Sequence, residues 1–213
     1  MLRQSSLFVA YAYPICPSRE LERILTNGNP RGQLRGAHSA MRAIILKKQD
    51  TNEYDQWVTC YTKEFGKLTA VAKSVLKPGS IQGMHLDVLN LVDFELISGR
   101  GMPIISAAQV ENSYRNLKSS YKSIAAAYFF LETIDKLVFE NDSDPILWKF
   151  LVETLENLDK NGYDAATFKR RQIKLLEILG YFHEASIINP GPYFEYHANV
   201  KFHSLPLLKN GRI

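Results

Sequence analysis

Cysteine is scarce in this sequence. Only two of the 213 residues are cysteines, Cys16 and Cys60. Two thiols are too few for a secreted disulfide framework, and they make a four-cysteine zinc site arithmetically impossible. Cys60 lies inside a strand-like run, where a buried and unreactive thiol is the usual arrangement. The cysteine content therefore predicts a reducing, cytoplasmic setting.

Long apolar runs and a strong excess of one charge are also lacking. No stretch approaches the ~20 apolar residues that a helix needs to cross a bilayer, so we expect no membrane span. Lysine and arginine total 26 against 22 aspartates and glutamates, which gives a net charge of +4. This mildly basic balance is compatible with an anionic partner but does not require one.

Sequence patterns of known catalytic sites are absent as well. Gly66-Lys67 lacks the preceding glycine loop of a phosphate cradle, and no GxSxG elbow occurs. His197 and His203 have no third ligand suggested nearby, so we expect ordinary surface histidines rather than a metal site. We predict a protein that is not an enzyme and that has no metal and no cofactor.

The first forty residues differ from the rest. They contain five arginines and no lysine, with a Gly/Pro/Asn-rich stretch from Asn27 to Gly32. The pattern favours Met41 as the biological start, with residues 1–40 as a poorly ordered upstream extension. A short helix from Ser18 to Leu25 in a mobile arm is the alternative.

Residues 41–112 show the pattern of short β-strands. The strand-like runs are Arg42 to Lys48, Trp57 to Thr62, Lys67 to Val75, Val88 to Ile97 and Met102 to Val110. Turn residues separate them, notably Gly66 and the segments 77–80 and 98–101. Five short strands favour a closed barrel, because closure removes exposed edges. An OB-fold fits this count, and an SH3-like barrel is the nearest alternative.

Residues 113–184 change to the 3.6-residue period of helices. Asp135 interrupts the otherwise apolar stripe of a first helix. A second helix is expected to begin at Asp144-Pro145 and to end at Asn161-Gly162, and a third to begin at Asp164. The tail, residues 185–213, is expected to be irregular or a short hairpin. The predicted fold class is α+β multidomain, with an N-terminal five-stranded OB-fold barrel followed by an α-helical bundle.

Two groups of basic residues are candidate binding sites. Around the barrel loops lie Lys47, Lys67, Lys73, Lys77 and Arg100, which could follow a phosphate backbone. Interleaved aromatics could stack on bases: Tyr54, Trp57, Tyr61 and Phe65. However, residues 41–112 contain eight Lys/Arg and eight Asp/Glu, so a solvated lysine face is the alternative. In the last helix, Phe168, Arg170, Arg171 and Lys174 form either a solvated face or an anchor for an acidic peptide.

The order of these motifs resembles the bacterial recombination mediator family RecO, from Arg42 to Tyr181. The similar segments in the barrel are AIILKK, the turn Glu53 to Asp55, Tyr61 to Leu68, Ala70 to Lys73, the basic loop Lys77 to Ser80, and Gly99 to Gly101. In the helical half they are Tyr128 to Leu137, which includes Glu132, and LLEILGY at Leu175 to Tyr181.

This resemblance implies a DNA-repair function without catalysis. Its members bind single- and double-stranded DNA, anneal complementary strands, and work with RecR to load the RecA recombinase onto DNA coated by single-stranded DNA-binding protein. The resemblance makes Lys47, Lys67, Lys73, Lys77 and Arg100 candidates for DNA contact. It makes Phe168, Arg170, Arg171 and Lys174 candidates for binding the acidic C-terminal tail of the single-stranded DNA-binding protein. A cytoplasmic, nucleoid-associated location follows.

The sequence departs from the family pattern at three places. Ser74 stands where glycine is common, and Asp87 where proline is usual. The four-cysteine zinc module that many members carry after the Gly-Tyr motif is missing, which leaves a zinc-free branch and a truncated chain as open alternatives. An OB-fold adaptor that binds RNA or protein only is the alternative function.

Overall fold

The structure, a computed structural model, describes residues 41–97, 99, 101–181 and 190–209. The predicted N-terminal extension at residues 1–40 lies outside the described residues, and so do Cys16 and Arg100.

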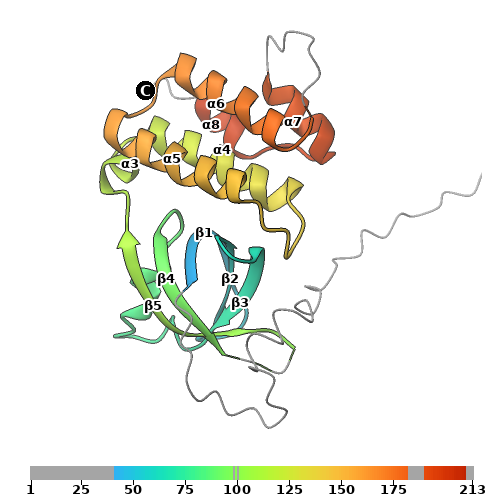
Figure 1. Ribbon diagram of the computed structural model, residues 1–213. Coiled ribbons are helices and arrows are strands. Elements are labelled where there is room, and N and C mark those ends of the chain that lie inside the picture. Colours follow the sequence, from blue (N-terminus) through green and yellow to red (C-terminus); the bar gives the residue numbers. More distant parts are fainter. Residues whose placement is uncertain (1–40, 98, 100, 182–189, 210–213) are drawn as a thin grey trace, which may run out of the picture.

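Five strands close into a barrel in the first half of the described chain (Figure 1). They are β1 (Met41–Asp50), β2 (Gln56–Thr62), β3 (Gly66–Ala72), β4 (Leu91–Ile97) and β5 (Ile104–Asn112). Their order is β1-β2-β3-β5-β4, and β4 pairs back with β1. Neighbouring strands are antiparallel except for β3 and β5, which run parallel. The prediction of a five-stranded OB-fold barrel is confirmed.

Alternation along the strands decides which residues fill the barrel. In β3 the buried positions Leu68, Ala70 and Ala72 alternate with the half-buried Lys67, Thr69 and Val71. Small residues on the inner face suit the narrow interior of a five-stranded barrel. Cys60 is also on this inner face and 1% exposed, so the expectation of a buried thiol is confirmed. Desolvation raises the pKa of Cys60 well above its ordinary value.

The helices form two layers over one end of the barrel (Figure 1). They are α3 (Arg115–Ser119), α4 (Tyr121–Leu137), α5 (Pro145–Asn161), α6 (Ala165–Ile178), α7 (Pro190–Ala198) and α8 (Ser204–Lys209). Helices α4 and α5 lie next to the barrel, with α6, α7 and α8 beyond them. One further short helix, α2 (Gln82–His85), lies in the β3–β4 connection. No helix in the described ranges has the length and hydropathy of a membrane span.

The predicted helix boundaries agree with the observed caps. The Asp144 carboxylate accepts a hydrogen bond from the Ile146 amide at 2.7 Å, and Pro145 occupies the first turn of α5. Gly162 ends α5 with a φ of +72°, a left-handed conformation that glycine adopts without strain. The Asp164 carboxylate caps α6 by accepting from the Thr167 amide at 2.7 Å.

The expectation of an irregular or hairpin tail at residues 185–213 is wrong, because its described part forms α7 and α8. Pro190 and Pro192 stand in the first turn of α7, where a missing backbone N–H costs nothing. Phe194 and Phe202 pack against Phe129 of α4, with ring centroids 5.0 and 5.6 Å apart. Tertiary packing therefore turns the tail into an outer part of the helical domain.

The barrel and the helices share one apolar core. Ile44 and Leu46 of β1 and Tyr61 of β2 belong to the same buried cluster as residues of α4, α5 and α6. Tyr61 stacks on Trp148 of α5 at 6.4 Å, and its hydroxyl accepts a hydrogen bond from the Asp144 amide at 3.2 Å. A second cluster fills the barrel interior. The shared core fixes the barrel and the helical domain relative to one another.

Candidate nucleic-acid interface

Two of the predicted DNA-contact lysines face the helical domain. Lys47 of β1 forms an ion pair with Asp135 of α4, with Nζ and Oδ2 3.2 Å apart. The ammonium group of Lys67 donates a hydrogen bond to the backbone carbonyl of Asp135 at 2.7 Å. Asp135, which interrupts the apolar stripe of its helix, thus receives two barrel cations.

Lys67 is also held through its backbone and its surroundings. Its carbonyl accepts a hydrogen bond from the Asn141 amide at 2.8 Å, and its backbone forms an isolated parallel β-bridge with that of Glu140. Desolvation lowers the pKa of Lys67, although the charges of Asp135 and Glu140 act in the opposite direction. A lysine in this position stabilises the junction between barrel and helices, and little of its charge faces solvent.

The other two described lysines of the set lie together at the far end of the strands. Lys73 and Lys77 follow β3 and are exposed, and no ion pair to either is formed within the described part of the chain. The Lys77 ammonium lies over the Tyr54 ring, 5.3 Å from its centroid. Since β3 has seven residues and strands rise about 3.3 Å per residue, roughly 20 Å separates its two ends.

Hydrogen bonds join the β1–β2 loop to the segment that carries these two lysines. The Asp55 carboxylate accepts from the Ser74 amide at 2.7 Å and from Asn52 Nδ2 at 3.1 Å. The Leu76 amide donates to the Tyr54 carbonyl at 3.0 Å. The Ser74 and Asn52 hydrogen bonds lower the pKa of Asp55. Tyr54, Lys73 and Lys77 are therefore presented on one ordered pair of loops, which we call the loop platform.

The predicted DNA-contact residues lie in two separate places and do not form one cluster. Lys47 and Lys67 lie at the helical end, Lys73 and Lys77 belong to the loop platform, and Arg100 is outside the described residues. The sequence could not reveal this division, because Asp135 lies 88 residues from Lys47 and 68 from Lys67 along the chain.

The four aromatic candidates for base stacking also separate. Tyr61 is 0% exposed and belongs to the shared core, while Phe65 packs against the barrel interior cluster. Trp57 is half-buried on the outer face of β2. Tyr54 is 36% exposed on the loop platform. Trp57 and Tyr54 are the two aromatics of this group that remain reachable from solvent at the platform end.

The second predicted site lies on α6, on the side of α5 away from the barrel (Figure 1). Phe168 and Arg171 line a small pocket with Thr154 and Leu158 of α5. The Phe168 ring packs edge-on against Phe129 and Phe130, at 5.4 and 5.5 Å, and thus forms the pocket's apolar wall.

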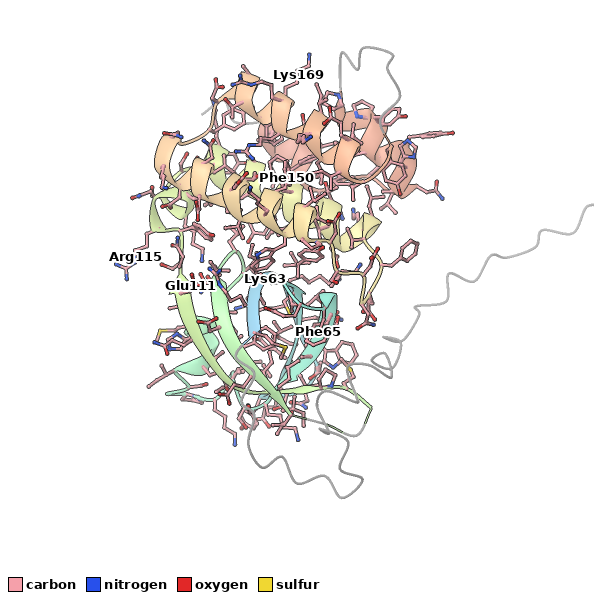
Figure 2. The ribbon with its side chains drawn as sticks, viewed as in Figure 1. Lys63, Phe65, Glu111, Arg115, Phe150 and Lys169 are labelled. Atoms are coloured by element: carbon pink, nitrogen blue, oxygen red, sulfur yellow. The ribbon has the colours of Figure 1, made fainter. Side chains whose placement is uncertain are left out.

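Arg171 gives this pocket a cation. Its guanidinium lies 5.8 Å from the centroid of the Phe150 ring and 3.9 Å from a Glu153 carboxylate oxygen. Figure 2 shows Phe150 inside the helical domain, whereas Lys169 projects from its outer edge. Arg170 donates to the Thr167 hydroxyl at 2.9 Å, and Lys174 forms an ion pair with Glu177 at 2.9 Å. The four predicted tail-binding residues therefore share one helix. Phe168 and Arg171 line the pocket, whereas Arg170 and Lys174 are not among its lining residues.

Among the described residues, no group of three or more His, Cys, Asp or Glu side chains is arranged to hold a metal ion.

The strand order, the closed barrel and the attached helical domain define an OB-fold protein with a helical extension. Residues 38–114 match the family Recombination protein O N terminal, and residues 118–186 match Recombination protein O C terminal. The chain belongs to the RecO family, as its motifs predicted.

Individual relatives agree with this assignment. A DNA repair protein RecO from Syntrophomonas wolfei is 29% identical over 140 residues, which are 66% of this chain and 56% of that protein. A DNA repair protein RecO from Dehalococcoides mccartyi is 30% identical over 140 residues, which are 66% of this chain and 55% of that protein. The chain spans about half the length of the curated relatives it matches.

Proposed function

We propose that this protein is a DNA-binding recombination mediator that acts in DNA repair without catalysing a reaction. Membership of the RecO family carries this proposal, because the matched relatives are named DNA repair proteins. The loop platform supports it, since Lys73 and Lys77 are exposed cations without ion-pair partners among the described residues. Such cations bind phosphates by releasing condensed counterions.

In this proposal the helical domain binds a protein partner. The pocket between α5 and α6 combines the apolar ring of Phe168 with the guanidinium of Arg171. An acidic peptide with an apolar end, such as the C-terminal tail of single-stranded DNA-binding protein, would set a carboxylate against Arg171 and an apolar side chain against Phe168 on this surface. The protein then anneals strands and, together with RecR, helps load RecA onto coated DNA.

Salt-titrated DNA binding and strand annealing test this function. A mediator binds single-stranded DNA with an affinity that falls steeply with salt, by a logarithmic slope of ~−0.7 for each phosphate contact. It also accelerates annealing of complementary strands, both naked and coated with single-stranded DNA-binding protein. An adaptor for RNA or protein only would show neither the DNA binding nor the acceleration, and that result would refute the proposal.

A further inference from the structure

The α4–α5 connection, residues 138–144, combines an exposed aromatic ring with acidic side chains. Phe139 is 81% exposed, more than any other large hydrophobic residue in the described part of the chain. Glu140, Asp142 and Asp144 follow it, and the connection contains no lysine or arginine. It therefore has the same chemistry as the peptide proposed for the α5–α6 pocket, namely carboxylates beside an apolar side chain.

One of these carboxylates remains available for a partner. Asp144 caps α5, and Glu140 accepts a hydrogen bond from the Thr69 hydroxyl at 3.5 Å. Asp142 is exposed, and no ion pair to it is formed among the residues that the structure describes. The exposed ring of Phe139 and the carboxylate of Asp142 are thus presented together on one short loop.

The connection cannot reach the pocket of its own molecule. Its backbone is fastened to the barrel, because the Asn141 amide donates to the Lys67 carbonyl at 2.8 Å and the Asp144 amide donates to the Tyr61 hydroxyl at 3.2 Å. The pocket residue Leu158 lies fourteen residues further along α5, which is roughly 20 Å at a rise of 1.5 Å per residue. A contact between the two surfaces must therefore join two molecules.

Helix α6 offers the complementary chemistry at the pocket. Residues 168–174 include four basic residues and no acidic ones. Lys169 and Arg170 are exposed, and no ion pair to either is formed within the described ranges, whereas the other two cations lie beside carboxylates. Figure 2 shows Lys169 projecting from the outer edge of the helical domain, and Phe168 supplies the apolar wall next to it.

We propose that the α4–α5 connection of one molecule docks on the α5–α6 pocket of a second copy. Phe139 then packs against Phe168, and Asp142 pairs with Lys169 and Arg170. Since the two surfaces differ, the copies associate head to tail. This inference rests on the proposed role of the pocket as a site for acidic, apolar-ended chains, and it gives that pocket a second occupant. An acidic tail therefore competes with self-association.

The self-association is weak and depends on concentration, because one loop on one pair of helices buries less than the ~1,200 Å² of a stable interface. Sedimentation of the full chain between about 1 μM and about 1 mM should show an average mass that rises with concentration. The rise should be smaller at high salt, since salt screens the charges across the contact. A protein that stays monomeric over this range would overturn the proposal.

Substitutions on each surface locate the contact. Phe139→Ser removes the ring from the connection, and Lys169→Glu with Arg170→Glu reverses the charge beside the pocket. Each is expected to weaken self-association by about tenfold or more. Met84→Ser is the matched control, because Met84 is 70% exposed on α2, which belongs to neither surface. If Met84→Ser weakens self-association as much as Phe139→Ser, the contact is not specific to the connection and the proposal is wrong.

A mixture of the two variants is the sharpest test. Phe139→Ser retains an intact pocket, and the charge-reversed variant retains an intact connection. An equimolar mixture should form dimers but no larger species, because both outer surfaces of such a dimer are defective. A mixture that stays monomeric while the unaltered protein associates would show that these two surfaces do not meet.

A short peptide of aspartates that ends in phenylalanine distinguishes this inference from the function on which it rests. Saturating peptide is expected to dissociate the assemblies into monomers. If the peptide binds and the unaltered protein never associates, the pocket keeps its proposed role and the self-association is refuted. Assemblies that persist with bound peptide would place the contact elsewhere and refute it as well. If the protein neither associates nor binds the peptide, the proposed role of the pocket itself fails.

Discussion

The Glu132 carboxylate anchors the start of α8 to α4. It accepts hydrogen bonds from the His203 and Ser204 amides at the start of α8, at 2.9 and 3.0 Å. It also accepts from the Ser204 hydroxyl at 2.6 Å and from Lys136 at 2.7 Å. Burial opposes ionisation of this group, but the hydrogen bonds from Lys136, Ser204 and His203 outweigh burial and lower the pKa of Glu132.

The lowered pKa makes the stability of α8 depend on pH. A carboxyl with a depressed folded-state pKa adds stability above its unfolded pKa, and this stability is lost as pH falls through the folded-state value. We expect Glu132→Gln to lower the free energy of unfolding by about 1–2 kcal/mol at neutral pH. The difference from the unaltered protein should shrink as pH falls below 4.5, the ordinary pKa of the group.

Urea denaturation of both proteins at neutral and acidic pH checks this prediction, and amide exchange at Ser204 locates the change. Glu153→Gln is a suitable control, because Glu153 is half exposed and pairs only at 3.8 and 3.9 Å. If the loss of unfolding free energy caused by Glu132→Gln does not change with pH, the packing of the side chain and not its charge stabilises α8.

Other individual residues show where sequence reasoning stopped. The types and positions of the barrel lysines could be read from the sequence, but not which of them are already engaged. Lys67 is engaged by a backbone carbonyl of Asp135, and a carbonyl leaves no signature in the sequence. Similarly, Tyr61 and Tyr54 are the same residue type in neighbouring segments of the sequence. They differ in exposure because the helices cover Tyr61 and leave Tyr54 at the surface.

Among the elements, the β2–β3 hairpin meets the α4–α5 connection at Gly66. This residue has a φ of +69°, and a Cβ atom there would lie 2.0 Å from the Asp142 carbonyl oxygen. Gly79 has a similar φ of +85°, but a Cβ atom there would meet nothing within 4 Å. Alanine at Gly79 therefore measures the cost of backbone strain alone, whereas alanine at Gly66 measures that strain together with the steric clash at the junction.

We expect Gly79→Ala to lower the free energy of unfolding by about 1–2 kcal/mol, the cost of a left-handed conformation. Gly66→Ala adds the clash with Asp142 and should cost about 3 kcal/mol or more. Chemical denaturation measures both. Equal effects of the two substitutions would show that the hairpin can move away from the α4–α5 connection without cost.

Elements with local signals were predictable and those formed by long-range packing were not. Asp144, Gly162 and Asp164 mark helix ends through contacts within four residues, so their pattern was sufficient. Helix α7 is a different case: its proline-rich, aromatic sequence indicated a loop or hairpin, but burial of Phe194 among α4 side chains outweighs that preference. The closed barrel was predicted from the number of short strands and from the turn residues between them, whereas the strand order β1-β2-β3-β5-β4 came from the structure.

At the scale of the whole molecule, the two proposed binding surfaces lie far apart. The loop platform is at the end of β3 remote from the helices, and the α5–α6 pocket is beyond α5 on the opposite side. The shared core of barrel and helices connects them rigidly. If the loop platform binds DNA and the α5–α6 pocket binds an acidic tail, as we propose, one molecule holds both at the same time without competition between them.

We expect the two surfaces to be separable by charge substitutions. Arg170→Glu with Arg171→Glu should abolish binding of an acidic, apolar-ended peptide and leave affinity for oligothymidylate within about twofold. The loop platform and α6 lie at opposite ends of the molecule, and salt screens charges that are more than a Debye length of ~8 Å apart. Lys73→Ala with Lys77→Ala should weaken binding of oligothymidylate and leave affinity for the peptide within about twofold. Fluorescence anisotropy with each labelled ligand measures both affinities. If saturating peptide displaces DNA from the unaltered protein, the two ligands share one surface, and a molecule that binds both at once is excluded.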